Sequence, residues 1–174
     1  MNDDTEPFAD ALRILIDKQE IRDCVCRYGR GIDRHDEDVL RTVFHPDAID
    51  NHGDVTLRRD EFIEWGNQWH ENVAVAHTHN MTSHFSDIDG DEAHAMTYVI
   101  FGLCRKDGVT LHIGGGRYID RLQKREGGWG IVVRRITIDW RFDTDRSTAD
   151  ILAGHPRGTW DRSDPSYAFL AGSL

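Results

Sequence analysis

Apolar residues in the first part of the chain recur with the spacing of helices. Between Phe8 and Tyr28 they return about every 3.6 residues, which predicts one long amphipathic helix. Asp36 can cap a second, short helix, whose apolar stripe ends at Phe44. The sequence His45-Pro46-Asp47 is expected to break this helix, because proline cannot continue a helical hydrogen-bond ladder.

After the second helix, the pattern predicts a short two-stranded ribbon, a third helix and then a series of long strands. The ribbon is predicted at 48–52 and 55–58, and Asp60 can cap the helix that follows it. Alternating apolar and polar residues then predict four strands, at 74–88, 92–105, 110–123 and 130–142. Turns rich in Asp and Gly separate these strands, so consecutive antiparallel pairing is expected.

This order of elements predicts an α+β fold. Three N-terminal helices packed on a strongly curved, mostly antiparallel sheet would form a cone around an internal pocket. The whole chain, 1–174, is expected to be one domain, with a core at 8–142 and an extended tail at 143–174 that packs on its own domain or on a neighbour. A wide sheet needs cover on its outer face, so a homodimer or homotrimer is expected.

Composition and charge narrow the possible partners. The chain has 21 basic and 31 acidic residues, a net charge of −10, which disfavours binding to nucleic acid or to an anionic membrane surface. It contains no apolar stretch of about 18 residues, and its acidic start lacks the pattern of a signal peptide, so a cytoplasmic protein is expected. Three cysteines, an odd number, argue against a disulfide scaffold.

Several motifs carry a family resemblance, and they fall in three stretches: 27–33 (RYGRGID) with 39–48, 79–84 with 87–93, and 113–118 with 127–129 and 138–140. Their order resembles the SnoaL-like branch of the nuclear-transport-factor-2-like superfamily, which includes scytalone dehydratase, bile-acid 7α-dehydratase and hexachlorocyclohexane dehydrochlorinase. The resemblance extends roughly from Leu12 to Phe142. It implies the cone-shaped fold, whereas the reactions that this fold supports are diverse.

Asp33 and Tyr28 are the first candidates for chemistry. The resemblance implies that both reach into the pocket, where the aspartate orients and polarises a histidine that acts as general base. The tyrosine would then donate a hydrogen bond to an oxygen of the substrate. The structural alternatives are a solvated helix end for Asp33 and a core aromatic residue for Tyr28.

The position of the histidine is the point where the sequence departs from the family. Counting back along the strand from Asp89-Gly90-Asp91 places Asn80 where the family has its catalytic histidine. Side chains alternate along a strand, so His79 would then face away from the pocket. A β-bulge could turn His79 inward and preserve the histidine–aspartate pair. Otherwise the usual base is lost, because asparagine cannot accept a proton at neutral pH.

His112 and Arg134 are further candidates. His112 precedes three glycines on a central strand and could replace the base, or it could be a hydrogen-bonded histidine of the sheet. In the dehydrochlorinase an arginine five residues after a position like Trp129 faces the pocket and helps the leaving group depart, which the resemblance transfers to Arg134. The alternative for Arg134 is a surface ion pair, with Arg135 on the opposite face of the strand.

Aromatic residues could line the pocket and select its ligand. Trp65 and Trp69 lie four residues apart on the third predicted helix, and such stripes usually belong to a core. Together with other aromatic residues they suggest an apolar or aromatic ligand; the full set is Phe44, Trp65, Trp69, Phe101 and Trp140.

Ten histidines raise the question of a metal site. His77 and His79, together with His84 or His112, could supply imidazole ligands. The chain has no HExxH pattern and no matching carboxylate spacing, and the relatives it resembles work without a metal, so we expect neither a metal nor another cofactor. The glycines at 114–116 lack the strand–glycine–helix context of a dinucleotide site and indicate sheet curvature instead.

Three functions are compatible with these features. The first is a cofactor-free hydro-lyase of the scytalone-dehydratase type, acting on a small apolar or aromatic molecule that bears oxygen. The second is isomerase or cyclase chemistry in the same pocket, which needs the same acid–base groups. The third is a non-catalytic ligand-binding or assembly subunit, like the β subunit of ring-hydroxylating dioxygenases, which Asn80 at the place of the base would favour.

Overall fold

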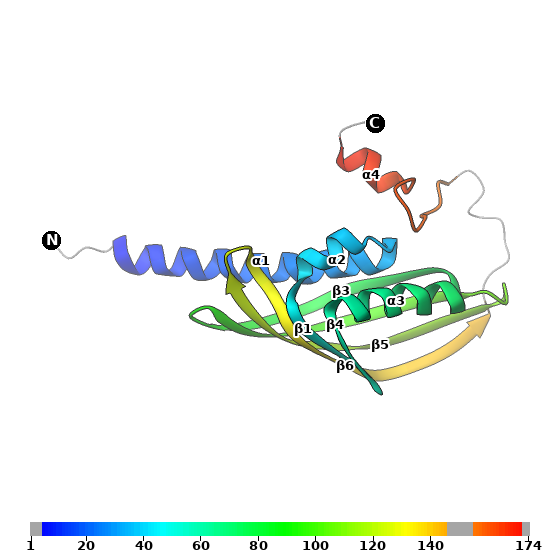
Figure 1. The fold of residues 1–174 in the computed structure, drawn as a ribbon, viewed down its shortest axis with the longest axis horizontal. Helices are drawn as coiled ribbons and strands as arrows, with labels where there is room; N and C mark the ends of the chain where they lie inside the picture. Colours follow the sequence, from blue (N-terminus) through cyan, green and yellow to red (C-terminus); the bar gives the residue numbers. More distant parts are fainter. Residues whose placement is uncertain (1–4, 146–154, 172–174) are drawn as a thin grey trace.

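The computed structural model describes residues 5–145 and 155–171 (Figure 1). Its helices are α1 (Thr5–Arg34), α2 (Glu37–Val43), α3 (Arg59–Val73) and α4 (Pro165–Leu170). Its strands are β1 (Phe44–His52), β2 (Val55–Arg58), β3 (Ala74–Asp89), β4 (Glu92–Arg105), β5 (Thr110–Arg125) and β6 (Gly128–Asp145). The predicted order of helices and strands is confirmed from α1 to β6.

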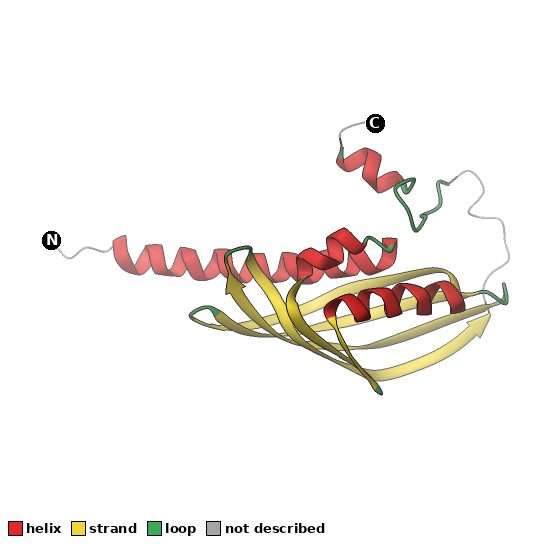
Figure 2. Ribbon diagram, in the orientation of Figure 1, coloured by secondary structure: helices red, strands yellow, loops and turns green. Residues whose placement is uncertain are grey.

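The strands form one curled, unclosed sheet in the order β2-β1-β6-β5-β4-β3. The strands from β3 to β6 pair consecutively and antiparallel, as their turns predicted. The pair β1–β6 is parallel, because the chain crosses from the ribbon to the far edge of the sheet through α3. Figures 1 and 2 show α1, α2 and α3 on one side of this sheet.

Two glycines allow α1 to pack closely on its neighbours. A Cβ atom at Gly31 would lie 2.8 Å from the side chain of Leu40 on α2, and one at Gly29 would lie 3.0 Å from Met81 on β3. The helix therefore continues through both glycines to Arg34, although glycine weakens an isolated helix. Their role is close packing, which brings the end of α1 to the concave face of the sheet.

The core fills the space between α1, α2, α3 and the concave face of the sheet. Its side chains are completely or almost completely buried, and they include Ile21, Leu40, Phe62, Leu122 and Ile131. Burial of a side chain of this size contributes about 1.5–3 kcal/mol to folding. Among the described residues, no helix is long and apolar enough to cross a membrane.

The structure differs from the prediction at several boundaries. The described residues contain four helices rather than three, since α4 lies in the tail that was expected to be extended. Asp36 caps α2 through Val39 N as predicted, but α3 begins directly after Arg58, so Asp60 lies in its first turn. Pro46 lies inside β1, where the ladder to β6 is interrupted and no backbone N–H is needed.

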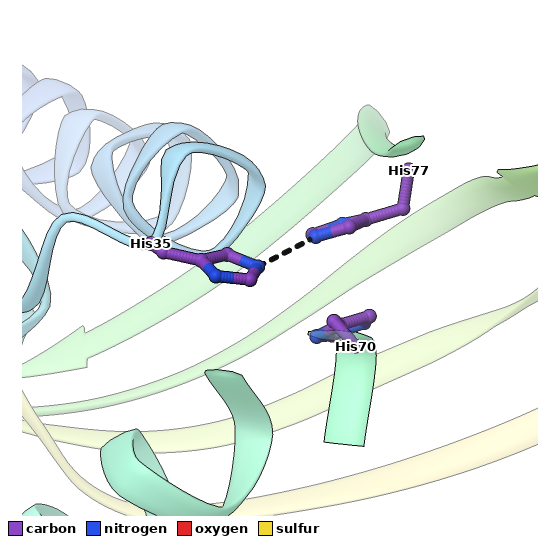
Figure 3. A group of neighbouring side chains, drawn as sticks. All are labelled: His35, His70 and His77. Carbon is purple, nitrogen blue, oxygen red and sulfur yellow. Dashed lines mark hydrogen bonds between the residues drawn. The ribbon is translucent and has the colours of Figure 1, made fainter. Parts of the chain in front are cut away.

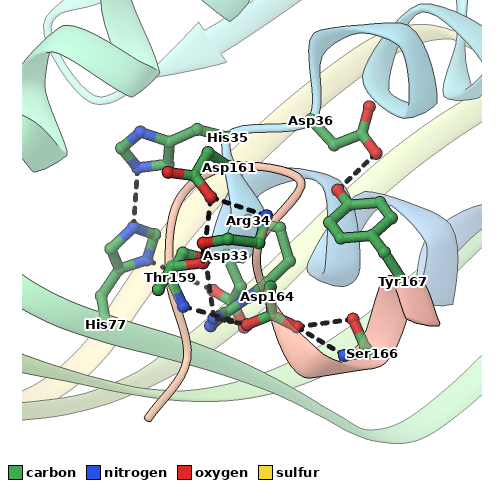
Figure 4. Close-up of polar contacts among 11 residues, drawn as sticks. Asp33, Arg34, His35, Asp36, His77, Thr159, Asp161, Asp164, Ser166 and Tyr167 are labelled. Carbon is green, nitrogen blue, oxygen red and sulfur yellow. Dashed lines mark hydrogen bonds and ion pairs between the residues drawn. The ribbon is translucent and has the colours of Figure 1, made fainter. Parts of the chain in front are cut away.

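Residues 155–171 return to the corner between α1 and α2 (Figure 4). Arg34 donates to Thr159 O over 3.2 Å and to Asp164 Oδ2 over 2.9 Å. The Tyr167 hydroxyl donates to Asp36 Oδ2 over 2.6 Å. This part of the tail thus packs on its own chain; residues 146–154 and 172–174, also predicted as tail, lie outside the described residues.

Asp164 is expected to control this docking in a pH-dependent manner. Burial raises the pKa of Asp164, but hydrogen bonds from Ser166 and Thr159 and the Arg34 guanidinium outweigh it and lower the pKa to about 2. Because the pKa is lowered, the contribution of the carboxylate is complete above pH 3.8 and is lost as the pH falls towards 2.

Asp164→Asn should therefore increase amide exchange in residues 155–171 at pH 7 by about tenfold or more, because it removes charge-assisted hydrogen bonds. Asp161→Asn is the control, since the described contacts of Asp161 stay within the segment, at Thr159 and Ser163. Unchanged exchange in Asp164→Asn would show that other contacts hold the segment.

Candidate functional site

The site is a mostly apolar cavity of about 390 Å³ between the helices and the concave face of the sheet. Tyr28 and Ile32 of α1, the aromatic residues of α3, and side chains of β3, β4, β5 and β6 line it. A cavity of this size accommodates a small ligand and buries most of its surface.

An imidazole–carboxylate pair lies at the wall of the cavity. Asp33, in the last turn of α1, accepts two hydrogen bonds from His79 of β3: Nδ1 donates to Oδ1 over 2.7 Å, and the backbone N donates to Oδ2 over 2.9 Å. With the Nδ1 proton on the side of Asp33, the lone pair of the imidazole is at Nε2. His79 lines the cavity, so this unprotonated nitrogen is available to a ligand.

The carboxylate of Asp33 stays charged over a wide pH range. Burial raises the pKa of Asp33, but the imidazoles of His77 and His79 and the backbone N–H of His79 outweigh burial and lower it to about 2. A charged carboxylate at Nδ1 fixes the tautomer and the orientation of the His79 ring. The pair has the geometry of a general base with an orienting partner.

A bulge in β3 explains why His79, and not Asn80, faces the cavity. Met81 pairs with Val99 and His84 pairs with Thr97, so β3 carries one residue more than β4 in this interval. The prediction counted back from the β3–β4 turn without this extra residue. It therefore assigned the side chains before the bulge to the wrong faces of β3 and placed Asn80 inside the cavity. In the structure Asn80 is exposed and donates to Ile100 O over 3.3 Å.

Tyr28 is a buried hydrogen-bond donor at the cavity. Its ring packs edge-on against Tyr118 at a centroid distance of 5.3 Å, and the guanidinium of Arg134 lies 4.0 Å from its ring centroid. Burial raises the pKa of the Tyr28 hydroxyl well above its usual range, although the charge of Arg134 opposes this. The phenol therefore keeps its proton and can donate a hydrogen bond to a ligand oxygen.

Arg134 lies beneath the cavity wall. Its side chain is completely buried and forms a bidentate ion pair with Asp120, at 2.8 and 2.7 Å. Burial lowers the pKa of Arg134, but the carboxylate of Asp120 raises it by more than burial lowers it, so the guanidinium remains a cation. Arg134 faces inward as expected, but it contacts the cavity through the rings of Tyr28 and Tyr118, at 4.0 and 4.4 Å. The arginine that lines the cavity is Arg141, which the sequence analysis did not single out.

His112 forms a second imidazole–carboxylate pair. Its Nδ1 contacts Asp143 Oδ1 at the end of β6, and its ring also lines the cavity. Phe101 separates the two pairs, since its ring lies 6.2 Å from both His79 and His112. The structure therefore does not bring His112 to Asp33.

The five aromatic candidates divide into three groups. Trp65, Trp69 and Phe101 line the cavity. Phe44 is buried in the core, with its ring edge-on to Tyr28 at 5.9 Å. Trp140 lies on the outer face, because Gly116 pairs with Ile138 and Gly115 with Trp140, so that β6 has one extra residue and its alternation reverses.

The structure groups histidines differently from the sequence analysis. His84 bonds Thr97 and His112 bonds Asp143, so neither joins His77 and His79. Two other sets have side-chain ligand atoms within 4.8 Å of one another: His35, His70 and His77, and Asp33, His77 and His79. His35 and His70 were missed because 42 residues separate His35 from its partner His77 and only the fold brings them together.

Comparison with known proteins places this chain in a family. The family model described as the SnoaL-like domain matches residues 13–135. The chain belongs to the SnoaL-like domain family. A search of curated proteins gives no match.

Solved structures share the fold of this SnoaL-like domain. The hexachlorocyclohexane dehydrochlorinase LinA-type3 from Novosphingobium barchaimii is similar with a TM-score of 0.71 and 16% identity, over 77% of this chain and 94% of that one. A nuclear-transport-factor-2-like superfamily protein from Salmonella enterica has a TM-score of 0.65 and 19% identity, over 83% and 99%. A protein of unknown function from Mycobacterium tuberculosis has a TM-score of 0.64 and 26% identity, over 95% and 89%. The curled sheet with its packed helices is therefore a fold that these proteins share.

The buried ion pair beneath Tyr28 predicts a large effect on stability. Arg134→Met should lower the free energy of unfolding by about 3–5 kcal/mol, because Asp120 is then left buried without its partner. Arg125→Met is the matched control. It breaks the pair with Asp47, in which both side chains are exposed, and should leave the free energy of unfolding almost unchanged. Urea unfolding at pH 7 measures both, and a loss below about 1 kcal/mol in Arg134→Met would contradict this account.

Proposed function

We propose that this SnoaL-like domain is a cofactor-free lyase that eliminates water or a similar leaving group from a small molecule in the cavity. The observation that carries the proposal is the 2.7 Å contact between His79 Nδ1 and Asp33 Oδ1, with His79 at the cavity wall. The family includes proteins of diverse function, so the reaction is argued from the site.

His79 Nε2 would take a proton from a carbon atom next to a carbonyl group or an aromatic ring. The electron pair of that C–H bond would form the new double bond, and the leaving group would depart with its own bonding pair. The positive charge that develops on His79 is stabilised by Asp33, whose carboxylate is fixed at Nδ1. Tyr28 would donate a hydrogen bond to the departing oxygen.

The cavity wall indicates the kind of substrate. Its volume of about 390 Å³ and its mostly apolar lining favour a compact apolar or aromatic molecule. Arg141 adds a cation to the lining, which suits a carbonyl or phenolate oxygen on such a molecule. The neighbouring structure of a dehydrochlorinase is compatible with elimination in a cavity of this kind.

The main argument for a non-catalytic ligand-binding or assembly subunit no longer applies. It depended on Asn80 at the place of the base, whereas Asn80 is exposed and His79 lines the cavity. Isomerase or cyclase chemistry would use the same groups, and the products distinguish it from elimination: loss of water or of an acid changes the mass of the substrate, and isomerisation does not.

The test compares two adjacent residues of β3. A panel of cyclic β-hydroxyketones and halogenated cyclic hydrocarbons is incubated with the protein, and products are identified by mass spectrometry. For any substrate that is turned over, His79→Gln should lower kcat/KM by about 100- to 10,000-fold, because the base is lost. Asn80→Ala is the matched control and should leave the rate unchanged. Equal rates in His79→Gln and the wild type would contradict the role of His79.

We also propose that the protein forms a homodimer or homotrimer through the outer face of the sheet. Four large apolar residues there are 41–50% exposed: Tyr98, Ile100, Trp140 and Phe142. Contiguous exposed apolar surface of this kind is typical of an interface. Light scattering should find an oligomer that Trp140→Glu weakens and that Val109→Glu, in the β4–β5 turn, leaves intact. A monodisperse wild-type monomer would contradict the proposal.

A further inference from the structure

Three imidazoles from three parts of the fold lie together (Figure 3), and one of them, His70, also lines the cavity. His35 follows α1, His70 lies on α3 and His77 lies on β3. The Nε2 atoms of His35 and His77 share a hydrogen bond of 3.0 Å. The rings of His70 and His77 stack at a centroid distance of 3.9 Å with 12° between their planes, so a common ion requires rotation of the His70 ring. Each imidazole has a nitrogen within 4.8 Å of those of the other two.

The other nitrogen of each ring faces an oxygen atom. His70 Nδ1 is 2.8 Å from Gly66 O, so it carries the proton and leaves Nε2 free. His77 Nδ1 lies 3.2 Å from Asp33 Oδ1, and His35 Nδ1 lies 3.5 Å from Glu71 Oε1. Only the His70 contact is a hydrogen bond, whereas Nδ1 of His35 and Nδ1 of His77 have a carboxylate nearby without hydrogen-bond geometry. Histidines that bind a metal ion almost always direct their second nitrogen to a carboxylate or a carbonyl.

The backbone at His35 indicates that its imidazole is needed there. Asp36 N donates to Gly31 O over 2.9 Å and His35 N donates to Ile32 O over 3.4 Å, which is the pattern of a Schellman motif. His35 occupies the left-handed position of this motif with φ of 52°, where glycine has the lowest energy. A non-glycine residue held in this conformation is a feature of functional sites.

The three imidazoles are largely buried, and neutral imidazole is the form that binds metal ions. The side chains of His35 and His77 are 5% and 0% exposed, and Trp160 of the tail stacks on His35 at 4.4 Å. The cluster is therefore shielded from water.

We propose that His35, His70 and His77 bind one divalent transition-metal ion of the zinc type through their Nε2 atoms. Zinc–nitrogen bonds of about 2.0–2.1 Å give a tetrahedral edge of about 3.3 Å, close to the spacing of His35 and His77. An all-imidazole set favours zinc, cobalt, nickel or copper over magnesium or calcium.

The alternative set of Asp33, His77 and His79 is less suitable, because an ion there would occupy the carboxylate that orients His79. The proposed ion would link the α1–α2 corner, α3 and β3, and it takes no part in the elimination step. The inference is independent of the proposed function, since its test does not measure turnover.

The test uses the full chain after removal of metal with a chelator. Titration with ZnCl₂, followed by calorimetry, should give one binding site per chain, and thermal unfolding should shift upward at saturation. CoCl₂ should produce the visible absorption of tetrahedral Co²⁺ with nitrogen ligands.

Two variants and one control locate the site. His35→Gly suits the left-handed backbone and removes only the imidazole, and His70→Gln removes a second ligand. Each should weaken zinc binding by about 100-fold or more, since loss of an outer-shell partner alone costs about 10- to 100-fold. His94→Gln removes an exposed histidine of β4 that is outside both candidate sets and should bind like the wild type.

Two results would overturn the proposal. One is a wild-type protein with neither a saturable zinc site nor the tetrahedral cobalt spectrum, which requires no variant to fold. The other is equal zinc affinity in His35→Gly, His70→Gln and His94→Gln, which would place the ion elsewhere.

Discussion

The contacts of the Asp33 carboxylate organise the functional end of the molecule. One oxygen accepts the backbone N–H of His79 and the other accepts its imidazole N–H, so a single group joins α1 to β3 and orients the proposed base. The same carboxylate lies 3.2 Å from His77 Nδ1, which links the cavity to the cluster of three histidines. Close packing of α1 at Gly29 and Gly31 places this carboxylate where both histidines can reach it.

The fold followed from the sequence because its determinants are local. Helical spacing, the Asp36 cap and the turns between strands predicted the order of elements and the antiparallel pairing. The β-bulges could not be predicted from such local signals, because neither Thr82-Ser83 nor Asp139 is a glycine or a proline. One extra residue reverses the face of every side chain beyond it. This explains both the inward position of His79 and the outward position of Trp140.

Part of the candidate site could not be predicted from the sequence, because it depends on contacts between residues that are distant along the chain. The family resemblance supplied Asp33, Tyr28 and a histidine near 79, but Arg141, His35 and His70 became visible only in three dimensions. The partner of Arg134 could have been found, because Asp120 is a charged residue between the inward-facing Tyr118 and Leu122. A carboxylate on the apolar face of a strand predicts a buried cation opposite it.

The most direct measurement of the central claim is the tautomer of His79, read from a long-range ¹H–¹⁵N spectrum of the histidine side chains at neutral pH. His79→Gln assigns the signals, and Asp33→Asn shows which of them depend on the carboxylate. The account predicts a protonated Nδ1 and an unprotonated Nε2 in the wild type, with a change in the tautomer balance in Asp33→Asn. A proton on Nε2, with Nδ1 unprotonated, would contradict the account, because the nitrogen at the cavity could then not accept a proton.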